Sequence, residues 1–335
     1  MSPDSPTVQT ARAPAKRFSR ATRTAGIVGL GSALPEGRVS SAEIGARVGV
    51  SAEWIERRTG IRERRHAAPG DRVSDLAVSA ARIALNDAGV DAAEIDMVLV
   101  ATLASDEITP SAAPIVAHEL GAVNAAAIDV GAACSGSVAG LAHATSWIEA
   151  GRASHVLVIG AEILTRFVDL DDRRTAPSPN SGAGAMVVSA HADGEIGPFV
   201  FGADGGRADA IQATRERGVI EMEGHETFLQ AVHRLSTSTV EVVDLAGLAL
   251  SDIDLFVYHQ ANSRILTAVA ARLEVPGERV FDCIAEMGNT SAASVPLALD
   301  AAVAAGALAP GARVVLGAIG AGLSWGATVM TWGGA

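Results

Sequence analysis

A gapless internal repeat constrains this chain more than any other feature of its sequence. Residues 88–97 (AGVDAAEIDM) align with residues 246–255 (AGLALSDIDL), and both stretches run from a helical pattern into an apolar run. At nearly the same offset, a helical pattern around Ser137 has a counterpart around Ser294. A repeat of this length lies far above the ~20–50-residue periods of solenoid proteins. The sequence therefore predicts two duplicated α/β halves.

The order of apolar runs and helical patterns indicates how each half is built. Apolar runs at residues 95–101, 126–130 and 155–160 alternate with helical patterns at 110–120 and 134–149. This alternation is typical of βαβ units and predicts a mainly parallel, buried sheet. The polar run at 169–181 and the glycine-rich run at 202–206 interrupt the repeat, and we expect residues 163–225 to form excursions around a site. The N-terminal half is placed at residues 25–190 and the C-terminal half at 191–335.

Composition excludes several classes of protein. Residues 1–24 are basic but contain no apolar stretch, so they predict a flexible leader and no secretory signal. No apolar run reaches the ~18–20 residues that span a bilayer, so no membrane association is expected. The two cysteines, Cys134 and Cys283, cannot form a disulfide framework and indicate a cytoplasmic protein. A net charge of −12 argues against a general nucleic-acid binder.

Four short segments could carry chemistry. Cys134 follows an apolar run and precedes a helical pattern, and a helix start favours the thiolate over the reference pKa of about 8.5. By itself this pattern fits a buried, inert cysteine equally well. His259 follows the apolar run 255–257, at the strand end where parallel sheets collect ligands. Asn289 lies in a Gly-Asn turn that alone predicts only a helix N-cap.

The fourth segment is the glycine-rich turn at residues 317–322, whose backbone N–H groups could approach an oxyanion. Together the four segments supply what thiol-based acyl transfer requires. Cys134 would attack a thioester, while His259 and Asn289 would donate hydrogen bonds to the enolate formed when a malonyl group loses CO2. No cofactor is needed for this chemistry, and no His or Cys cluster has the spacing of a metal site.

In these segments the chain resembles the ketoacyl-acyl carrier protein synthase III branch of the thiolase-like condensing enzymes. The resemblance runs from about Gly26 to the C-terminus and is carried by Ala-Ala-Cys134-Ser-Gly, His259-Gln-Ala-Asn and Gly-Asn289-Thr-Ser-Ala-Ala-Ser. It implies a homodimer of α/β subunits with a five-layered αβαβα fold and a Cys-His-Asn triad below a pantetheine tunnel. Cys134 would be acylated by an acyl-CoA or acyl-carrier starter, with the N–H groups of Cys134 and Ala321 as the oxyanion hole. The acyl group would then condense with malonyl-acyl carrier protein and initiate a fatty acid or polyketide.

The same resemblance assigns residues outside the triad. It implies that Trp54 and Arg58 bind the adenine of CoA and that Arg173 flanks it. It also implies that Asn262 contacts pantetheine and that Arg264 meets the carrier protein.

The chain departs from the family pattern at three places. Pro179-Asn180-Ser181 stands where the family usually has Phe-Gly-Asp. Thr109 replaces a bulky aromatic residue at the tip of the acyl pocket, and Leu229 replaces a frequent basic residue. We expect a roomier primer pocket and weaker carrier docking.

Two other functions remain open at this point. One is an acyltransferase that moves the acyl group from Cys134 to a hydroxyl or amine without condensation. The other is an inactive partner subunit, which would tolerate loss of the triad. The presence of Cys134, His259 and Asn289 together favours the condensing enzyme.

Overall fold

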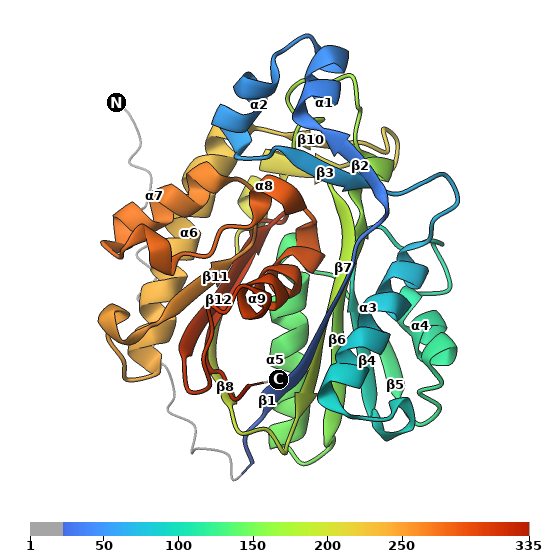
Figure 1. Cartoon of the computed structure of the whole chain (residues 1–335), viewed down its shortest axis with the longest axis vertical. Helices are drawn as coiled ribbons and strands as arrows, with labels where there is room; N and C mark the ends of the chain where they lie inside the picture. The colour runs from blue at the N-terminus through green and yellow to red at the C-terminus, as the bar shows by residue number, and fades with distance from the viewer. Residues whose placement is uncertain (1–22, 335) are drawn as a thin grey trace, which may run out of the picture.

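Two β-sheets face each other across a central layer of helices in the computed structural model of the protein, which describes residues 23–334 (Figure 1). Nearly all of the predicted leader therefore lies outside the described residues. The first sheet has the strand order β1 (Gly26–Ala33), β7 (Ser181–Ser189), β6 (His155–Ile163), β4 (Met97–Ala101) and β5 (Ala126–Val130). The second has the order β11 (Leu255–Tyr258), β12 (Arg313–Gly320), β13 (Ser324–Thr331) and β8 (Glu195–Ala203).

Helices form the other three layers. Helices α3 (Val73–Ala88) and α4 (Ala112–Leu120) cover the outer face of the first sheet. Helices α6 (Gly224–Leu245) and α7 (Ser263–Leu273) cover the outer face of the second, and α5 (Gly136–Glu149) and α9 (Ser294–Ala304) lie between the sheets. This arrangement confirms the predicted five-layered αβαβα fold.

Short elements cap one end of the layers, at the top of Figure 1. They are β2 (Gly37–Ser40), α1 (Ser41–Val48), α2 (Ala52–Thr59), β3 (Glu63–His66), β9 (Ile211–Ala213), β10 (Ile220–Met222) and α8 (Ile284–Met287).

The sheets are mixed, so the prediction of a mainly parallel sheet is wrong. Strands β4, β5 and β6 run parallel, but β7 pairs antiparallel with both β1 and β6. In the second sheet only the β11–β12 pair is parallel. Residues 181–189, which the sequence predicts within an excursion, form a strand whose residues are all buried.

The central helices bury most of their apolar side chains between the two sheets. Leu141 and Ile148 of α5 and Val295 and Leu299 of α9 are at most 1% exposed, and each such side chain stabilises the fold by about 1.5–3 kcal/mol. Small residues let the halves approach closely. A Cβ on Gly160 of β6 would lie 2.2 Å from the carbonyl oxygen of Ala292.

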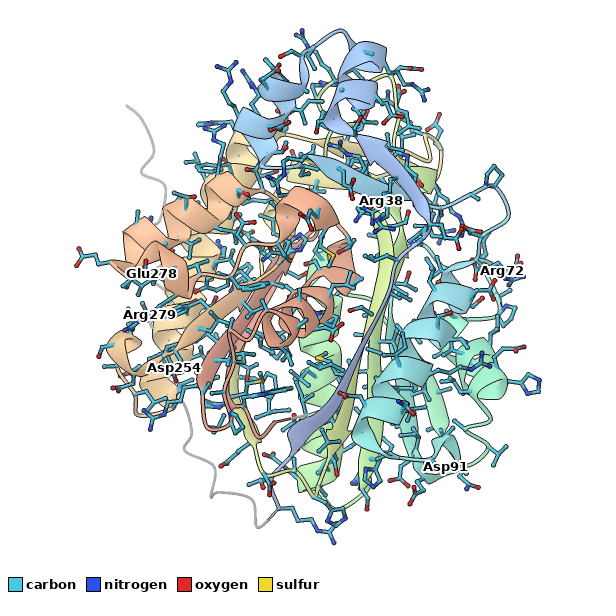
Figure 2. The ribbon with its side chains drawn as sticks, viewed as in Figure 1. Arg38, Arg72, Asp91, Asp254, Glu278 and Arg279 are labelled. Atoms are coloured by element: carbon cyan, nitrogen blue, oxygen red, sulfur yellow. The ribbon has the colours of Figure 1, made fainter. Side chains whose placement is uncertain are left out.

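The structure confirms the internal repeat in detail. Each copy contains a short 3-10 helix followed by a strand, namely Ala92–Glu94 before β4 and Leu250–Asp252 before β11. The carboxylate of Asp96 accepts a hydrogen bond from the backbone N–H of His155 at the start of β6. Asp254 (labelled in Figure 2) accepts the equivalent bond from Arg313 at the start of β12. The aligned aspartates therefore tie together equivalent strands.

Candidate active site

Cys134 lies on a strained turn between β5 and α5. The turn is a 3-10 helix, Ala133–Ser135, so α5 begins at Gly136, two residues later than predicted. Ala133 has a φ of 44°, and its counterpart before α9, Ser291, has a φ of 48°. Non-glycine residues rarely adopt such values, and they cluster at functional sites. The Ser135 hydroxyl donates to the Ala132 carbonyl (2.8 Å) and lies 3.2 Å from the Ser324 hydroxyl, which ties the turn to the segment after β12.

The surroundings of Cys134 favour the thiol and not the thiolate. Cys134 contacts the cavity described below but otherwise lies within the protein, and this burial raises the pKa of its thiol to about 11. The negative charge of Glu162 raises it further. The pKa is therefore raised and not lowered as expected, because loss of solvation outweighs the hydrogen bonds with Ser291 and the backbone that lower it.

His259 follows β11 at the carboxyl end of the strand, as predicted. Its backbone N–H donates to the Gly317 carbonyl (2.8 Å), and its ring Nδ1 lies 2.6 Å from the Ser294 hydroxyl oxygen. That oxygen also accepts a hydrogen bond from the Gln260 N–H (3.1 Å), so the hydroxyl hydrogen of Ser294 is available to Nδ1. Burial lowers the pKa of His259 to about 4, so the imidazole is neutral at pH 7.

Asn289 presents its amide nitrogen because its amide oxygen is already used. Its Oδ1 accepts a hydrogen bond from the Ser291 N–H (2.9 Å). This leaves the Nδ2 hydrogens as donors at the surface of the cavity that Asn289 lines. The sequence pattern predicted only a cap for the following helix.

The glycine-rich segment packs directly against the nucleophile. Strand β12 continues to Gly320, so the turn is shorter than the predicted 317–322. A Cβ on Gly320 would lie 2.6 Å from the backbone nitrogen of Cys134. Only glycine fits this contact, which brings the following residue, Ala321, to the wall of the same cavity.

One cavity of about 930 Å³ brings the four predicted chemical groups together. Cys134, His259, Asn289 and Ala321 all line it. Its remaining wall is mostly apolar, with Leu164, Phe167, Ile211, Met222, Leu235, Ile319 and Leu323 among its residues. A cavity with few polar groups and one nucleophile suits the acyl chain of a thioester.

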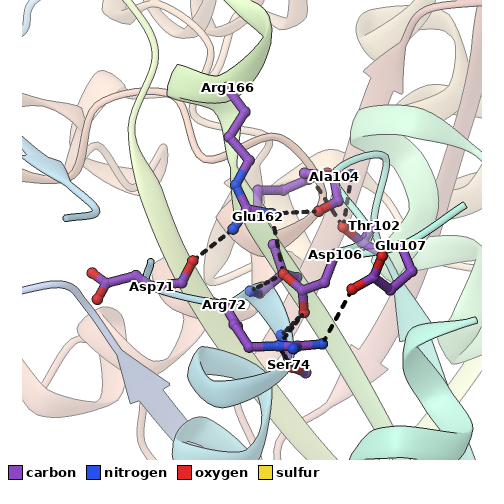
Figure 3. A network of polar contacts seen from close by, with 10 residues as sticks. Asp71, Arg72, Ser74, Thr102, Ala104, Asp106, Glu107, Glu162 and Arg166 are labelled. Atoms are coloured by element: carbon purple, nitrogen blue, oxygen red, sulfur yellow. Dashed lines mark hydrogen bonds and ion pairs between the residues drawn. The ribbon is translucent and has the colours of Figure 1, made fainter. Parts of the chain in front are cut away.

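A polar network fixes the loop that forms one side of this cavity (Figure 3). Asp106 accepts hydrogen bonds from the N–H groups of Val73 (2.8 Å) and Ser74 (3.0 Å) and pairs with Arg166 (3.1 Å). Burial alone would raise the pKa of Asp106, but the backbone bonds lower it, so Asp106 is a carboxylate. Glu162 accepts from the N–H of Leu103, a lining residue of the same loop (3.3 Å). Burial raises the pKa of Glu162 to about 8.

Thr109 does not line the cavity of its own chain. It is exposed on the loop beyond Ile108, which is 93% exposed. Its neighbour Ile108 does line the cavity, so Thr109 lies one residue beyond the cavity wall, and its part in the acyl pocket stays a prediction.

The residues assigned to CoA and carrier binding lie at the surface. The guanidinium of Arg58 stacks on the ring of Trp54 (4.3 Å to the centroid), and Arg264 lies over the ring of Phe228 (5.8 Å). Arg173 is exposed. The Asn262 side chain accepts from the Arg264 N–H and donates to the Arg58 carbonyl (2.8 Å), so it joins α7 to α2 and does not line the cavity.

The sequence patterns indicate no role for Ser294 or Ser324, whereas the close approach at Gly320 agrees with the predicted glycine-rich turn. Ser294 was visible within the Asn289 motif, but its contact with His259 joins residues 35 positions apart. Only the folded chain shows such a contact.

Two further observations concern the described residues as a whole. In residues 23–334 no three His, Cys, Asp or Glu side chains are grouped so that they could hold a metal ion. Among the helices of that same range, none has the length and apolar character to cross a membrane.

Family profiles and curated proteins match this chain over most of its length. The family profile described as 3-Oxoacyl-[acyl-carrier-protein (ACP)] synthase III matches residues 128–205, and that of its C terminal matches 243–332. The chain is 42% identical to the beta-ketoacyl-[acyl-carrier-protein] synthase III of Bacillus pumilus, over 92% of this chain and 99% of that protein. It is 43% identical to synthase III 3 of Streptomyces coelicolor, over 93% and 98%.

Solved structures of similar fold also include synthase III enzymes. The priming β-ketosynthase of the R1128 polyketide pathway superimposes with a TM-score of 0.89 at 37% identity, covering 96% of this chain and 99% of that one. The synthase III of Aquifex aeolicus superimposes with a TM-score of 0.89 at 38% identity, covering 92% and 100%. The chain belongs to the β-ketoacyl-[acyl-carrier-protein] synthase III family.

Proposed function

We propose that this protein is a decarboxylative condensing enzyme that joins an acyl starter to a malonyl-carrier thioester and so initiates a fatty acid or polyketide. One observation carries the proposal. His259 and Asn289 each have one polar atom fixed by the protein, so that each presents an N–H donor to the cavity that contains Cys134. Two N–H donors that line one cavity beside the nucleophile suit the stabilisation of an enolate oxygen.

The first half-reaction acylates the cysteine. The Cys134 sulfur attacks the thioester carbonyl, the bond to the CoA sulfur breaks, and the thiol proton leaves with CoA. Cys134 and Ala321 supply backbone N–H groups to the oxyanion, since Gly320 holds the two segments in contact. Burial raises the pKa of this thiol to about 11, so the resting form that reacts carries its proton.

The second half-reaction forms the carbon–carbon bond. Malonyl thioester loses CO2, and its carbonyl oxygen becomes an enolate that accepts from His259 Nε2–H and Asn289 Nδ2–H. A proton on Nε2 follows if Ser294 donates to Nδ1, and a neutral imidazole fits the lowered pKa of His259. The enolate carbon then attacks the acyl carbonyl, the bond to Cys134 breaks, and the thiol regains a proton.

The surface residues suit the parts of the substrates that remain outside the cavity, namely the nucleotide of acyl-CoA and the carrier protein. Arg58 and Trp54 offer a cation and an aromatic face to the nucleotide of an acyl-CoA, and Arg173 adds positive charge. Arg264 offers a cation to an acidic carrier protein. A cytoplasmic location, where both substrates would be available, is part of the same proposal.

A second copy of the chain completes the proposed enzyme. Strand β5 is one edge of the first sheet, and its Ile128 is 50% exposed. Ile108, on the loop that precedes α4, is 93% exposed. An exposed edge strand with apolar residues is a template for pairing. Pairing would carry the loop of Thr109 towards the partner's cavity. Wild type should be a dimer in light scattering, and Ile128→Lys should shift it to a monomer. An Ile128→Lys variant that stays as dimeric as wild type would contradict this interface.

The half-reactions provide the test of the residue roles. Wild type incubated with a panel of acyl-CoAs should gain the mass of one acyl group, and Cys134→Ala should gain none. His259→Ala should gain the acyl group but fail to release CO2 from malonyl-carrier protein. Acylation of Cys134→Ala, or normal CO2 release by His259→Ala, would contradict the assignment.

A further inference from the structure

The segment that departs from the family pattern, Pro179-Asn180-Ser181, lies directly against the loop that carries Asn289. The Asn180 N–H donates to the Asn289 carbonyl (2.8 Å), and the Asn289 N–H donates to the Ser178 carbonyl (2.9 Å). Pro179 and Asn289 thus form a parallel bridge. Both the N–H and the carbonyl of Asn289 are therefore hydrogen-bonded to residues 178–180.

The Asn180 side chain adds a second attachment to the same loop. It is completely buried, and both ends of its amide are used. Its oxygen accepts a hydrogen bond from the Arg65 N–H of β3, and its nitrogen donates to the Met287 carbonyl, two residues before Asn289. The amide therefore links the Asn289 loop to a strand that is distant in the sequence.

The glycine before Asn289 fits this arrangement. Gly288 has a φ of 54° and a ψ of −162°, a conformation that disfavours a side chain. A Cβ at this position would lie 3.0 Å from the Asn180 Cβ. Asn180 thus packs against the residue at which the chain turns into Asn289.

The segment itself is anchored by a buried arginine. Arg64 is completely buried, donates to the Pro177 carbonyl (2.6 Å) and donates to the Ser41 hydroxyl (3.0 Å). Its neighbour in β3, Arg65, supplies the N–H that the Asn180 oxygen accepts. The chain just before the segment is therefore anchored to β3, so the segment can act as a support.

We propose that Asn180 is the positioning residue of Asn289: its buried amide holds the 287–289 loop so that the Asn289 amide donates to the enolate. This rests on the proposed role of Asn289 in condensation. The backbone of Cys134 is held by other elements, namely β5, α5 and the contact with Gly320, while its side chain also meets Ser291 of the turn after Asn289. Loss of Asn180 should therefore damage condensation and spare acylation of Cys134, a split that a general loss of structure would not produce.

The test measures both half-reactions in full-length Asn180→Ala and Asn180→Asp. Asp can still accept from the Arg65 N–H, but as a carboxylate it cannot donate to the Met287 carbonyl, which gives a second variant if Ala does not fold. We expect each folded variant to acylate Cys134 at the wild-type rate and to condense with malonyl-carrier protein about 10²-fold more slowly, as for a reacting group displaced by about 1 Å. Asn86→Ala, an exposed change on α3, is the matched control and should match wild type.

Asn289→Ala separates failure of this inference from failure of the proposed function. If Asn289→Ala loses condensation while the Asn180 variants keep it, the positioning role is wrong and the proposed function stands. If the Asn180 variants lose both half-reactions equally, Asn180 is only structural and the positioning role is also wrong. If Asn289→Ala condenses normally, the role of Asn289 is wrong and the inference falls with it.

Discussion

The contact between Gly320 and Cys134 gives a prediction whose magnitude follows from the structure. In Gly320→Ala the new methyl group would lie 2.6 Å from the Cys134 backbone nitrogen, 3.1 Å from its Cβ and 3.2 Å from the Ala133 Cβ. Ordinary contact begins at about 3.4 Å, so the nucleophile turn and β12 must separate by about 0.8 Å.

This separation moves the Ala321 donor of the proposed oxyanion hole relative to the Cys134 N–H and sulfur. Misplacement of reacting groups by about 1 Å costs about 10²-fold in rate, so we expect acylation of Cys134 to slow by about 10–10²-fold. Overpacking of the core should also destabilise the fold by about 1–3 kcal/mol.

The assay is rapid-quench intact mass spectrometry of the acyl-enzyme, with unfolding measured in denaturant. Gly277→Ala is the control, because a Cβ there meets nothing within 4 Å, and it should acylate at the wild-type rate. Wild-type acylation by a folded Gly320→Ala would refute the proposed geometry of the oxyanion hole.

Two further predictions concern His259. Ser294→Ala removes the partner of His259 Nδ1 and leaves the Gln260 N–H without its acceptor. We expect condensation to slow about tenfold, equivalent to about 1.4 kcal/mol, while acylation is unchanged. The two half-reactions are measured separately, and equal slowing of both would show that Ser294 is only structural. The second concerns pH: the pKa of His259 is lowered from 6.5 to about 4 on folding, so the unfolded chain binds more protons between these values. The resulting stability is complete above pH 6.5 and lost as pH falls towards 4, by about 3 kcal/mol in total. Denaturant titrations at several pH values should show a smaller loss for His259→Ala, and an equal loss would contradict the lowered pKa.

Much of the fold was predictable because its signals are local. The gapless match of residues 88–97 with 246–255 reflects equivalent 3-10 helices and strands, down to the aspartates Asp96 and Asp254 that bind neighbouring strands. The direction of β7 was not predictable in this way. Its partners, β1 and β6, are set by tertiary packing, and its uniformly buried residues carry no alternation that reports strand direction.

In the candidate site, too, the features with local sequence signals were predictable and those set by tertiary packing were not. Cys134, His259 and Asn289 follow strands or precede helices and could be found from those patterns. The pKa of Cys134 could not, because it depends on burial that the sequence does not encode locally. The contacts of His259 with Ser294 and of Asn180 with Met287 also join distant positions, so only the folded chain reveals them.

The central claim is that the acyl group on Cys134 is used for carbon–carbon bond formation. The most direct measurement mixes isolated acyl-enzyme with malonyl-carrier protein labelled in the free carboxyl group, in a single turnover, and follows CO2, product and enzyme mass together. We predict one CO2 and one β-ketoacyl-carrier product for each acyl group lost from Cys134, and neither product with Asn289→Ala. An acyl group that stays on Cys134 in the presence of malonyl-carrier protein but transfers to a small amine or alcohol would contradict condensation and establish simple acyl transfer.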